Sequence, residues 1–283
     1  MINNNSTKQD VRQFYDQVGW QKVSDDTYQN AQYEDLRPVS RAYIHKCHLR
    51  VNRHLNQSGK YLLDAGSGPI QYPEYLTYSS AYQYRVCLDI SFVALAEARE
   101  RIGTQHGMFV VGDVANLPFK DDSFDGIVSL HTLHHLPAED YIPAFHALKR
   151  VLTPGGAAVV VNGWSASGLM NLFRKPILFM ERRIRTGQKE LPGDISEPLQ
   201  SAEKKPSGTF VHKLGAASLR QQLGQDFPVE IRVWRSVSVR FLRAMIHPFL
   251  LGRFWLWVLY ILEELSPRFF GEKGQYPLIT FNK

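Results

Sequence analysis

The stretch KYLLDAGSGP, residues 60–69, joins a short apolar run to a carboxylate and two glycines. The apolar residues before Asp64 have the character of a strand that is buried on both faces. Gly66 and Gly68 come directly after this strand, and glycines allow a tight turn and a close approach of the backbone to a ligand. The stretch therefore predicts a strand that ends in a ligand-binding loop.

Short apolar runs recur along the rest of the chain, with helical stretches between them. The runs cover residues 85–91, 107–114, 124–131, 156–164, 229–239 and 276–283, and the helical stretches cover 91–102, 137–152 and 213–224. Each run is short and bounded by turn residues, which is typical of strands inside a parallel sheet. The alternation predicts an α/β fold, in which helices cover both faces of a mostly parallel sheet.

Charge is unevenly distributed over the 283 residues, which carry a net charge of +6. Residues 1–150 hold 15 Lys and Arg against 17 Asp and Glu, whereas residues 151–283 hold 18 against 10. The basic half is a solvated face or meets an anionic partner, such as a membrane surface or an acidic substrate. We find no nucleic-acid-binding motif and expect no nucleic-acid partner.

The two cysteines, Cys47 and Cys87, form no disulfide or metal-binding pattern. The N-terminus, MINNNSTKQD, lacks the apolar stretch of a secretory signal. Both features favour a reducing, cytoplasmic location.

Two further carboxylates end the next two predicted strands, Asp89 at the second and Asp113 at the third. The carboxyl ends of parallel strands share one edge of the sheet, where ligands of such folds bind. A carboxylate in the place of Asp89 accepts hydrogen bonds from both hydroxyls of a ribose. Asp113, with Val114 beside it, suits the exocyclic amine and ring of an adenine. The three acids together predict a cradle for a nucleoside.

The glycine loop alone also occurs in dinucleotide-binding oxidoreductases. Their fingerprint has a glycine at the sixth position, where the helix packs beneath a pyrophosphate. Gln71 occupies that position here. The loop therefore favours a nucleoside without phosphates.

Four motifs in this order, LLDAGSGP, CLDIS, VVGDVANLPFKDDSFDGIVSLHTLHHL and LKRVLTPGGAAVVV, resemble those of class I S-adenosylmethionine-dependent methyltransferases. The resemblance is strongest to the small-molecule group that includes the ubiquinone/menaquinone-biosynthesis type. It covers about residues 58–164, and YPLITFNK at 276–283 is similar to the family's final strand. The resemblance implies a Rossmann-like, seven-stranded sheet with an antiparallel last strand. It also implies S-adenosyl-L-methionine as cofactor and S-adenosyl-L-homocysteine as product.

Site residues carry over from the family by position. The resemblance implies that Asp64, Gly66 and Gly68 approach the methionine part of the cofactor, that Asp89 binds the ribose and that Asp113 and Val114 bind the adenine. Leu130 and His131 would line the cofactor after the fourth strand. The family often has a third glycine at the place of Ile70, so we expect a stiffer loop and a reshaped turn into the next helix.

Three further side chains carry open alternatives. Tyr15 and Tyr33 either close over the methionine carboxylate or pack in the core. His131 is the candidate general base, and a positioning role is the alternative. The HTLHH stretch at 131–135, with Glu139 and Asp140 nearby, contains residue types that bind metals, but we interpret it as the start of a helix and expect no metal.

The chain divides by composition into a helical cap segment (1–58), a cofactor-binding core (59–164), an insertion or lid (165–210) and a C-terminal part of the core (211–283). The last part carries a hydrophobic helical insertion at 240–275. Its FWLWVLYIL stretch, residues 254–262, is too short to span a bilayer. Residues 249–262 are therefore part of the cap core, a dimer contact or a peripheral membrane contact. The oligomeric state stays open.

The predicted function is transfer of a methyl group to an oxygen or carbon atom, in preference to nitrogen, of a small and lipophilic or bulky metabolite. SLHTLHHLP lacks the Asn/Asp-Pro-Pro-aromatic motif that is common in enzymes acting on DNA bases and glutamine. Two alternatives stay open. One is an NAD(P)-dependent oxidoreductase, and the other is a non-catalytic nucleoside-binding module with a membrane or protein partner.

Overall fold

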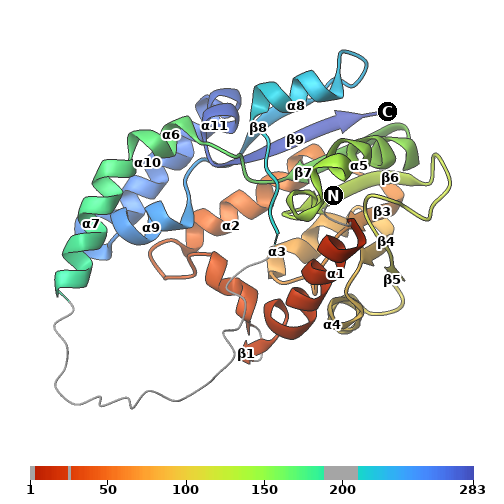
Figure 1. Ribbon diagram of the computed structural model, residues 1–283, viewed down its shortest axis with the longest axis horizontal. Helices are drawn as coiled ribbons and strands as arrows, with labels where there is room; N and C mark the ends of the chain where they lie inside the picture. Colours follow the sequence, from red (N-terminus) through yellow and green to blue (C-terminus); the bar gives the residue numbers. More distant parts are fainter. Residues whose placement is uncertain (1–3, 25–26, 188–209) are drawn as a thin grey trace.

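The computed structural model describes residues 4–24, 27–187 and 210–283 (Figure 1). At its centre lies a seven-stranded sheet in the order β5-β4-β3-β6-β7-β9-β8. The strands are β3 (Gly59–Ala65), β4 (Tyr82–Asp89), β5 (Gly107–Val111), β6 (Phe124–Leu130), β7 (Leu152–Val161), β8 (Glu230–Arg235) and β9 (Tyr276–Asn282). Strands β3 to β7 pair in parallel, and β9 runs antiparallel to both β7 and β8. The predicted α/β fold with an antiparallel last strand is confirmed.

All seven apolar runs form strands, but β7 begins earlier than the sequence predicts. It starts at Leu152 rather than at residue 156. Leu152 pairs with Phe124, and pairing resumes only where Ala157 meets Gly126. The TPGG segment, which the sequence indicates to be a turn, is therefore an irregularity inside the strand.

The strand order reverses beside β3, because β4 and β6 lie on its two sides. A crevice forms at such a reversal, since the connections leave the sheet toward opposite faces. The glycine loop after β3 lies at this point of the edge. The topology therefore places the predicted ligand-binding loop at this crevice beside β3.

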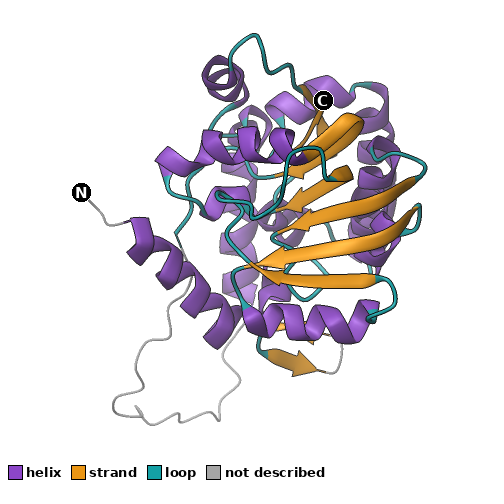
Figure 2. Ribbon diagram, turned by 90° about the vertical axis from the view of Figure 1, so that its right-hand side faces the viewer, coloured by secondary structure: helices purple, strands orange, loops and turns teal. Residues whose placement is uncertain are grey.

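Helices cover both faces of the sheet (Figure 2). On one face, α5 (Ala138–Val151) and α8 (Ala216–Leu223) pack with Phe145 and Leu219 in the same buried cluster as Leu63. This cluster excludes apolar side chains of the sheet from water, which is the main stabilising contribution to such a fold.

The other face carries a second cluster, which includes Leu62 and Val128 of the sheet and Val51 and Tyr78 from the segments around it. The remaining helices are α1 (Asn4–Phe14), α2 (Arg41–Leu49), α3 (Pro73–Leu76), α4 (Phe92–Ile102), α6 (Gly168–Leu172), α7 (Arg174–Gly187), α9 (Val239–Met245), α10 (Gly252–Leu265) and α11 (Pro267–Lys273). Helices α6, α7, α9 and α10 gather beyond the β8 end of the sheet (Figure 1).

The N-terminal segment contains a small sheet that the sequence does not reveal. β1 (Lys22–Ser24) pairs antiparallel with β2 (Thr27–Tyr28). These strands are too short for a period of two residues to be visible. In the segment predicted as a lid, α6 and α7 are helical and residues 188–209 lie outside the described residues. The division into cap, core and lid stays a prediction.

Helix α10 turns most of its aromatic side chains to solvent. Trp255 is 55% exposed and Trp257 is 54% exposed, and Phe249 just before the helix is 80% exposed. Burial of these rings in a cap core is therefore wrong. No helix within the described ranges is long and apolar enough to cross a bilayer.

The inner side of α10 is held by a buried carboxylate rather than by apolar contacts alone. Glu263 is fully buried and accepts hydrogen bonds from the Tyr43 hydroxyl (2.7 Å) and from the backbone N–H of Ser236 (2.9 Å). The Arg50 guanidinium pairs with it at 2.9 Å. Helix α10 is thus fixed to α2 and to the end of β8 by one charged network.

Candidate functional site

A cavity of about 490 Å³ opens at the carboxyl edge of the sheet. The residues predicted to bind a cofactor all line it, namely Tyr15, Asp64, Gly66, Gly68, Asp89, Asp113, Val114, Leu130 and His131. They come from α1 and its extension and from the ends of β3, β4, β5 and β6. The structure therefore brings the whole predicted set together, and the role of each member stays a prediction.

Asp89 is oriented by the glycine loop. One carboxylate oxygen, Oδ2, accepts a hydrogen bond from the Gly68 N–H (2.9 Å), and Oδ1 accepts one from the Ser91 N–H (2.9 Å). Each oxygen keeps a further lone pair that can accept from a ligand hydroxyl. Burial raises the pKa of Asp89 to about 6, although the two N–H groups act in the opposite direction.

The loop after β3 needs its glycines. Gly66 has φ of 78°, and a Cβ there would lie 2.1 Å from the Thr132 side chain. Gly68 has φ of 54° and lies under Trp20, which a Cβ would meet at 3.1 Å. Both glycines therefore allow Thr132 and Trp20 to pack directly against the loop, and they leave its backbone accessible to a ligand in the cavity.

Ile70 takes the left-handed conformation in the place of the family's third glycine, with φ of 56°. A branched side chain in that region costs about 1–3 kcal/mol. Ile70 is fully buried and clusters with Cys87, Leu95 and Ala98, so its packing offsets the backbone strain. A change in the turn relative to the family stays a prediction.

Asp64 is paired within the protein. Its Oδ2 accepts hydrogen bonds from two nitrogens of Arg85, one of them at 3.1 Å, and both side chains are buried. Burial raises the pKa of Asp64, against the opposing effect of Arg85. The sequence analysis missed Arg85, and its signal is a lone arginine inside the apolar run 85–91.

Asp113 is also paired, but at the rim of the cavity. Its Oδ2 lies 2.6 Å from the Lys8 ammonium, and its Oδ1 accepts from the Ala115 N–H (2.9 Å). Val114 beside it is buried in the core cluster. Lys8 on α1 is a lining residue that no motif indicated.

Tyr15 and Tyr33 both line the cavity, and Tyr15 is the more firmly held. Its hydroxyl lies 2.8 Å from Nε2 of His135, and its ring stacks on Trp20 with a centroid distance of 4.9 Å. Tyr33 is 49% exposed. Core packing of Tyr33 is therefore excluded, whereas contact of either tyrosine with a cofactor carboxylate stays a prediction.

His131 directly follows β6 and has φ of 55°. Its ring lies edge-on to Trp234 (4.9 Å between centroids) and to Tyr276 (5.7 Å). Burial and the neighbouring Arg235 lower the pKa of His131 to about 3. A neutral imidazole of such low basicity is better suited to positioning than to proton removal.

The histidines of the HTLHH stretch have partners within the protein. His134 lies 3.3 Å from the Asn162 side chain, and His135 Nδ1 lies 2.8 Å from the Phe210 carbonyl. Among the described residues, no group of three or more His, Cys, Asp or Glu side chains is arranged to hold a metal ion.

The cavity extends beyond the predicted residues, over the half of the sheet formed by β6, β7, β9 and β8. Five further polar or aromatic side chains line that half, namely Glu34, Tyr72, Lys213, Arg235 and Tyr276. The sequence analysis missed them, because they come from segments far apart in the chain and belong to no motif.

Residues 63–160 match the family described as "Methyltransferase domain". A phthiotriol/phenolphthiotriol dimycocerosates methyltransferase of Mycobacterium leprae is 33% identical over 118 residues, which cover 41% of this chain and 42% of that protein. A demethylmenaquinone methyltransferase of Staphylococcus saprophyticus is 31% identical over 143 residues, covering 48% and 60%. The chain thus spans about half the length of these relatives.

Among solved structures, the fold is similar to that of phosphoethanolamine N-methyltransferase 1 of Haemonchus contortus, solved with phosphoethanolamine and S-adenosylhomocysteine. The match has a TM-score of 0.57 and 13% sequence identity, and covers 100% of this chain and 50% of that one. A likeness at this identity establishes the fold and leaves the reaction to the site.

Proposed function

Since the chain contains a methyltransferase domain at residues 63–160 and has the class I methyltransferase fold, we propose that it transfers a methyl group from S-adenosyl-L-methionine to a small acceptor molecule. The acceptor atom is oxygen or carbon in preference to nitrogen. The product of the cofactor is S-adenosyl-L-homocysteine.

One observation carries this proposal, the carboxylate of Asp89 held by the glycine loop inside the cavity. A carboxylate with both oxygens fixed by backbone N–H groups is preorganised to accept the two hydroxyls of a ribose. Asp113 and Val114, which we propose to bind the adenine, and Gly66, which we propose to approach the methionine end, line the same cavity.

The cofactor's sulfonium methyl is already activated, so the residues of this chain contribute binding, orientation and the exclusion of water. Trp20 covers Gly68 and stacks on Tyr15, whose hydroxyl contacts His135. These contacts support the proposal that residues 1–58 form part of a cap over the site. Residues 165–210 and 240–275 are proposed to complete it.

We propose a lipophilic acceptor, because two relatives are named for a phthiotriol dimycocerosate and for demethylmenaquinone. The cavity half over β6, β7, β9 and β8 is lined by Tyr72 and Tyr276, which supports an acceptor with a planar or apolar body.

A lipophilic acceptor suggests that the protein acts at a membrane surface. Phe254, Trp255 and Trp257 are exposed on the outer side of α10, where Phe254 contacts both tryptophans, and Phe249 and Arg253 lie close by in the sequence, which is the composition of an interfacial helix. Free, buried Cys47 and Cys87 support a reducing compartment. We therefore propose a cytoplasmic enzyme that makes a peripheral contact with an anionic bilayer and has no nucleic-acid partner.

Isothermal titration with S-adenosyl-L-homocysteine and with NAD⁺ and NADP⁺ tests the proposed cofactor. We expect S-adenosyl-L-homocysteine to bind and the dinucleotides not to bind, because Gln71 replaces the glycine that a pyrophosphate needs. Binding of the dinucleotides instead would favour an oxidoreductase. Incorporation of label from methyl-labelled S-adenosylmethionine into a lipid extract then separates an enzyme from a non-catalytic module.

A further inference from the structure

The far half of the cavity carries positive charge, in contrast to the acidic half over β3, β4 and β5. Arg235 is the last residue of β8, and Tyr276 is the first residue of the antiparallel β9. Both therefore lie at the same edge as the carboxyl ends of the parallel strands, and both line the cavity together with Lys213.

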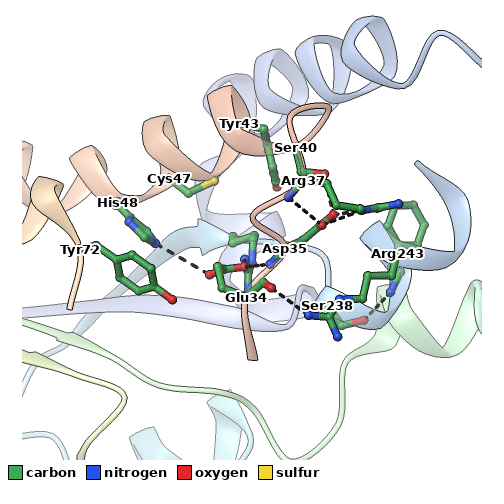
Figure 3. A network of polar contacts seen from close by, with 12 residues as sticks. Glu34, Asp35, Arg37, Ser40, Tyr43, Cys47, His48, Tyr72, Ser238 and Arg243 are labelled. Carbon is green, nitrogen blue, oxygen red and sulfur yellow. Dashed lines mark hydrogen bonds and ion pairs between the residues drawn. The ribbon is translucent and has the colours of Figure 1, made fainter. Parts of the chain in front are cut away.

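Arg235 is 2% exposed and its charge is balanced by Glu34. One oxygen of Glu34 accepts from Arg235 and from the Asp35 N–H (3.0 Å), and the other lies 3.8 Å from the His48 ring (Figure 3). Burial alone would raise the pKa of Glu34, but Arg235 and His48 outweigh it and lower the pKa to about 2. Glu34 is therefore ionised, and its charge is already neutralised by Arg235, which leaves it poorly suited to bind a cationic ligand.

Lys213 differs from Arg235 in its partners. It is half-buried, and it has no hydrogen-bond or ion-pair partner in the part of the chain that the structure describes. Burial lowers the pKa of Lys213, and no described carboxylate compensates. A partly desolvated ammonium without a counter-charge is costly unless a ligand supplies one.

The ammonium of Lys213 has a defined place. A Cβ added to Gly163, just after β7, would lie 3.1 Å from its Nζ and 3.6 Å from the Tyr276 ring. The loop that carries Lys213 is fixed on both sides, by a hydrogen bond from the His212 N–H to the His134 carbonyl (2.7 Å) and by one from the Ser165 N–H to the Leu214 carbonyl (3.1 Å). Gly163 thus leaves the space that the ammonium occupies at the end of β7.

We propose that Lys213 and Arg235 form a subsite for a carboxylate in this cavity, with Lys213 as its ion-pair partner. The carboxylate belongs to the methyl acceptor, so the subsite selects an acceptor that is acidic as well as lipophilic. Tyr276, which stacks under the Arg235 guanidinium at 4.7 Å, provides an aromatic wall beside it. The assignment of the carboxylate to an acceptor rests on the proposed function, whereas binding of a carboxylate does not.

The amino-acid end of the cofactor also carries a carboxylate and is the second candidate ligand for this subsite. Two matched pairs of probes distinguish the sources. 4-Hydroxybenzoate and 4-hydroxybenzamide differ in the acceptor-like carboxylate. S-adenosyl-L-homocysteine and 5′-methylthioadenosine differ in the amino-acid group. Each probe is titrated calorimetrically into the full chain, and the benzoate pair is also titrated with S-adenosyl-L-homocysteine at saturation.

The variants are Lys213→Met, which removes the charge at similar length, and Lys213→Arg, which keeps it. Lys175→Met on the exposed side of α7 is the control for net charge. We expect wild type to bind 4-hydroxybenzoate at least tenfold more tightly than the amide. Lys213→Met should remove this preference, and Lys213→Arg and Lys175→Met should keep it. Affinity for S-adenosyl-L-homocysteine should not change in any of them.

The other outcomes are equally defined. A preference for the benzoate that survives in Lys213→Met overturns the subsite, as does equal binding of benzoate and amide by wild type. If Lys213→Met weakens S-adenosyl-L-homocysteine but not 5′-methylthioadenosine, the carboxylate is the cofactor's and the acceptor assignment is overturned. If wild type fails to bind S-adenosyl-L-homocysteine yet prefers the benzoate, the subsite stands and the proposed function fails.

Discussion

The ammonium of Lys8 lies 2.6 Å from the carboxylate of Asp113, which joins helix α1 to the segment after β5 at the rim of the cavity. The same ammonium lies 2.6 Å from Asp140 in the first turn of α5. One lysine therefore holds the N-terminal helix against two separate parts of the core.

We expect Lys8→Met to loosen α1. Partly exposed ion pairs contribute about 0.2–1 kcal/mol each, so loss of the two pairs should make the amides of residues 4–14 exchange with deuterium about two- to thirtyfold faster. Exchange followed by mass spectrometry measures this. Arg12→Met is the control, because Arg12 lies on the same helix and, among the residues that the structure describes, pairs with Asp16 alone, at 3.4 Å. Unchanged exchange in Lys8→Met would show that α1 is held by its apolar contacts alone.

Asp89→Ala should weaken the binding of S-adenosyl-L-homocysteine by about 2–4 kcal/mol, because two hydrogen bonds to a charged group are lost in a buried place. The Gly68 and Ser91 N–H groups also lose their acceptor. Calorimetric titration measures the dissociation constant, with Asp10→Ala on the exposed side of α1 as a control. Equal affinity in Asp89→Ala and wild type would remove Asp89 from the binding site.

The pH dependence of binding follows from the same residue. The pKa of Asp89 is raised to about 6 by burial, with Asp64 and Asp16 acting in the same direction. Binding to the ionised carboxylate should therefore be full above this value. Below it, the affinity should fall by about tenfold per pH unit, because a proton must leave before both oxygens can accept. Titrations between pH 5 and 7.5 test this, and a constant affinity over that range contradicts it.

In the ligand-free protein, the raised pKa of Asp89 makes folding stability change with pH in the opposite direction to ligand affinity. A carboxyl whose folded pKa lies above its unfolded value favours folding most at low pH, and this contribution is lost as the pH rises through about 6. A bound ligand whose hydroxyls donate hydrogen bonds to the ionised Asp89 carboxylate should reduce the loss. Thermal unfolding of the free and the liganded protein at pH 5 and 7.5 compares the two.

Glu34→Gln should destabilise the protein by about 3–5 kcal/mol, because it leaves the buried Arg235 without its counter-charge. Urea unfolding measures the change, and Glu139→Gln on the exposed side of α5 should have little effect. The double variant Glu34→Gln/Arg235→Met should recover part of the loss. A double variant less stable than Glu34→Gln would mean that Arg235 stabilises the fold without Glu34.

The aromatic face of α10 should bind bilayers. We expect the protein to co-sediment with phosphatidylglycerol vesicles and only weakly with phosphatidylcholine vesicles, since Arg253 favours anionic headgroups. Trp255→Ser/Trp257→Ser should reduce the bound fraction several-fold. Phe92→Ser is the control, because Phe92 is 66% exposed on α4, outside this face. Equal binding by the tryptophan variant would exclude the face as the contact.

The strands and their terminal acids were predictable because their signals are local. Each buried strand is a short apolar run, and Asp64, Asp89 and Asp113 follow from where these runs end. Ile70 was also noticed, since a branched residue stands where the family often has glycine, but its left-handed conformation came only from the structure. The residues that determine each of these features lie within a few positions of it in the sequence.

The other half of the cavity was not predictable in this way. Glu34 and Arg235 are separated by 201 positions, and in the acidic half the same holds for Lys8 and Asp113, which are separated by 105. Their pairing depends on how whole elements pack, which no spacing rule encodes. The orientation of α10 was left open for a related reason. Its apolar composition allowed a cap core, a dimer contact or a membrane contact, and the structure excludes burial of its exposed rings.

The buried carboxylate on the inner side of α10 has a mechanical consequence. Glu263 is held by the Tyr43 hydroxyl, the Ser236 N–H and the Arg50 guanidinium, so α10 cannot roll about its axis without stripping a charge of its partners. The helix is therefore fixed in its rotation about its own axis. A partner of its outer face meets a rigid platform rather than one that must first be assembled, and little conformational entropy is lost on contact.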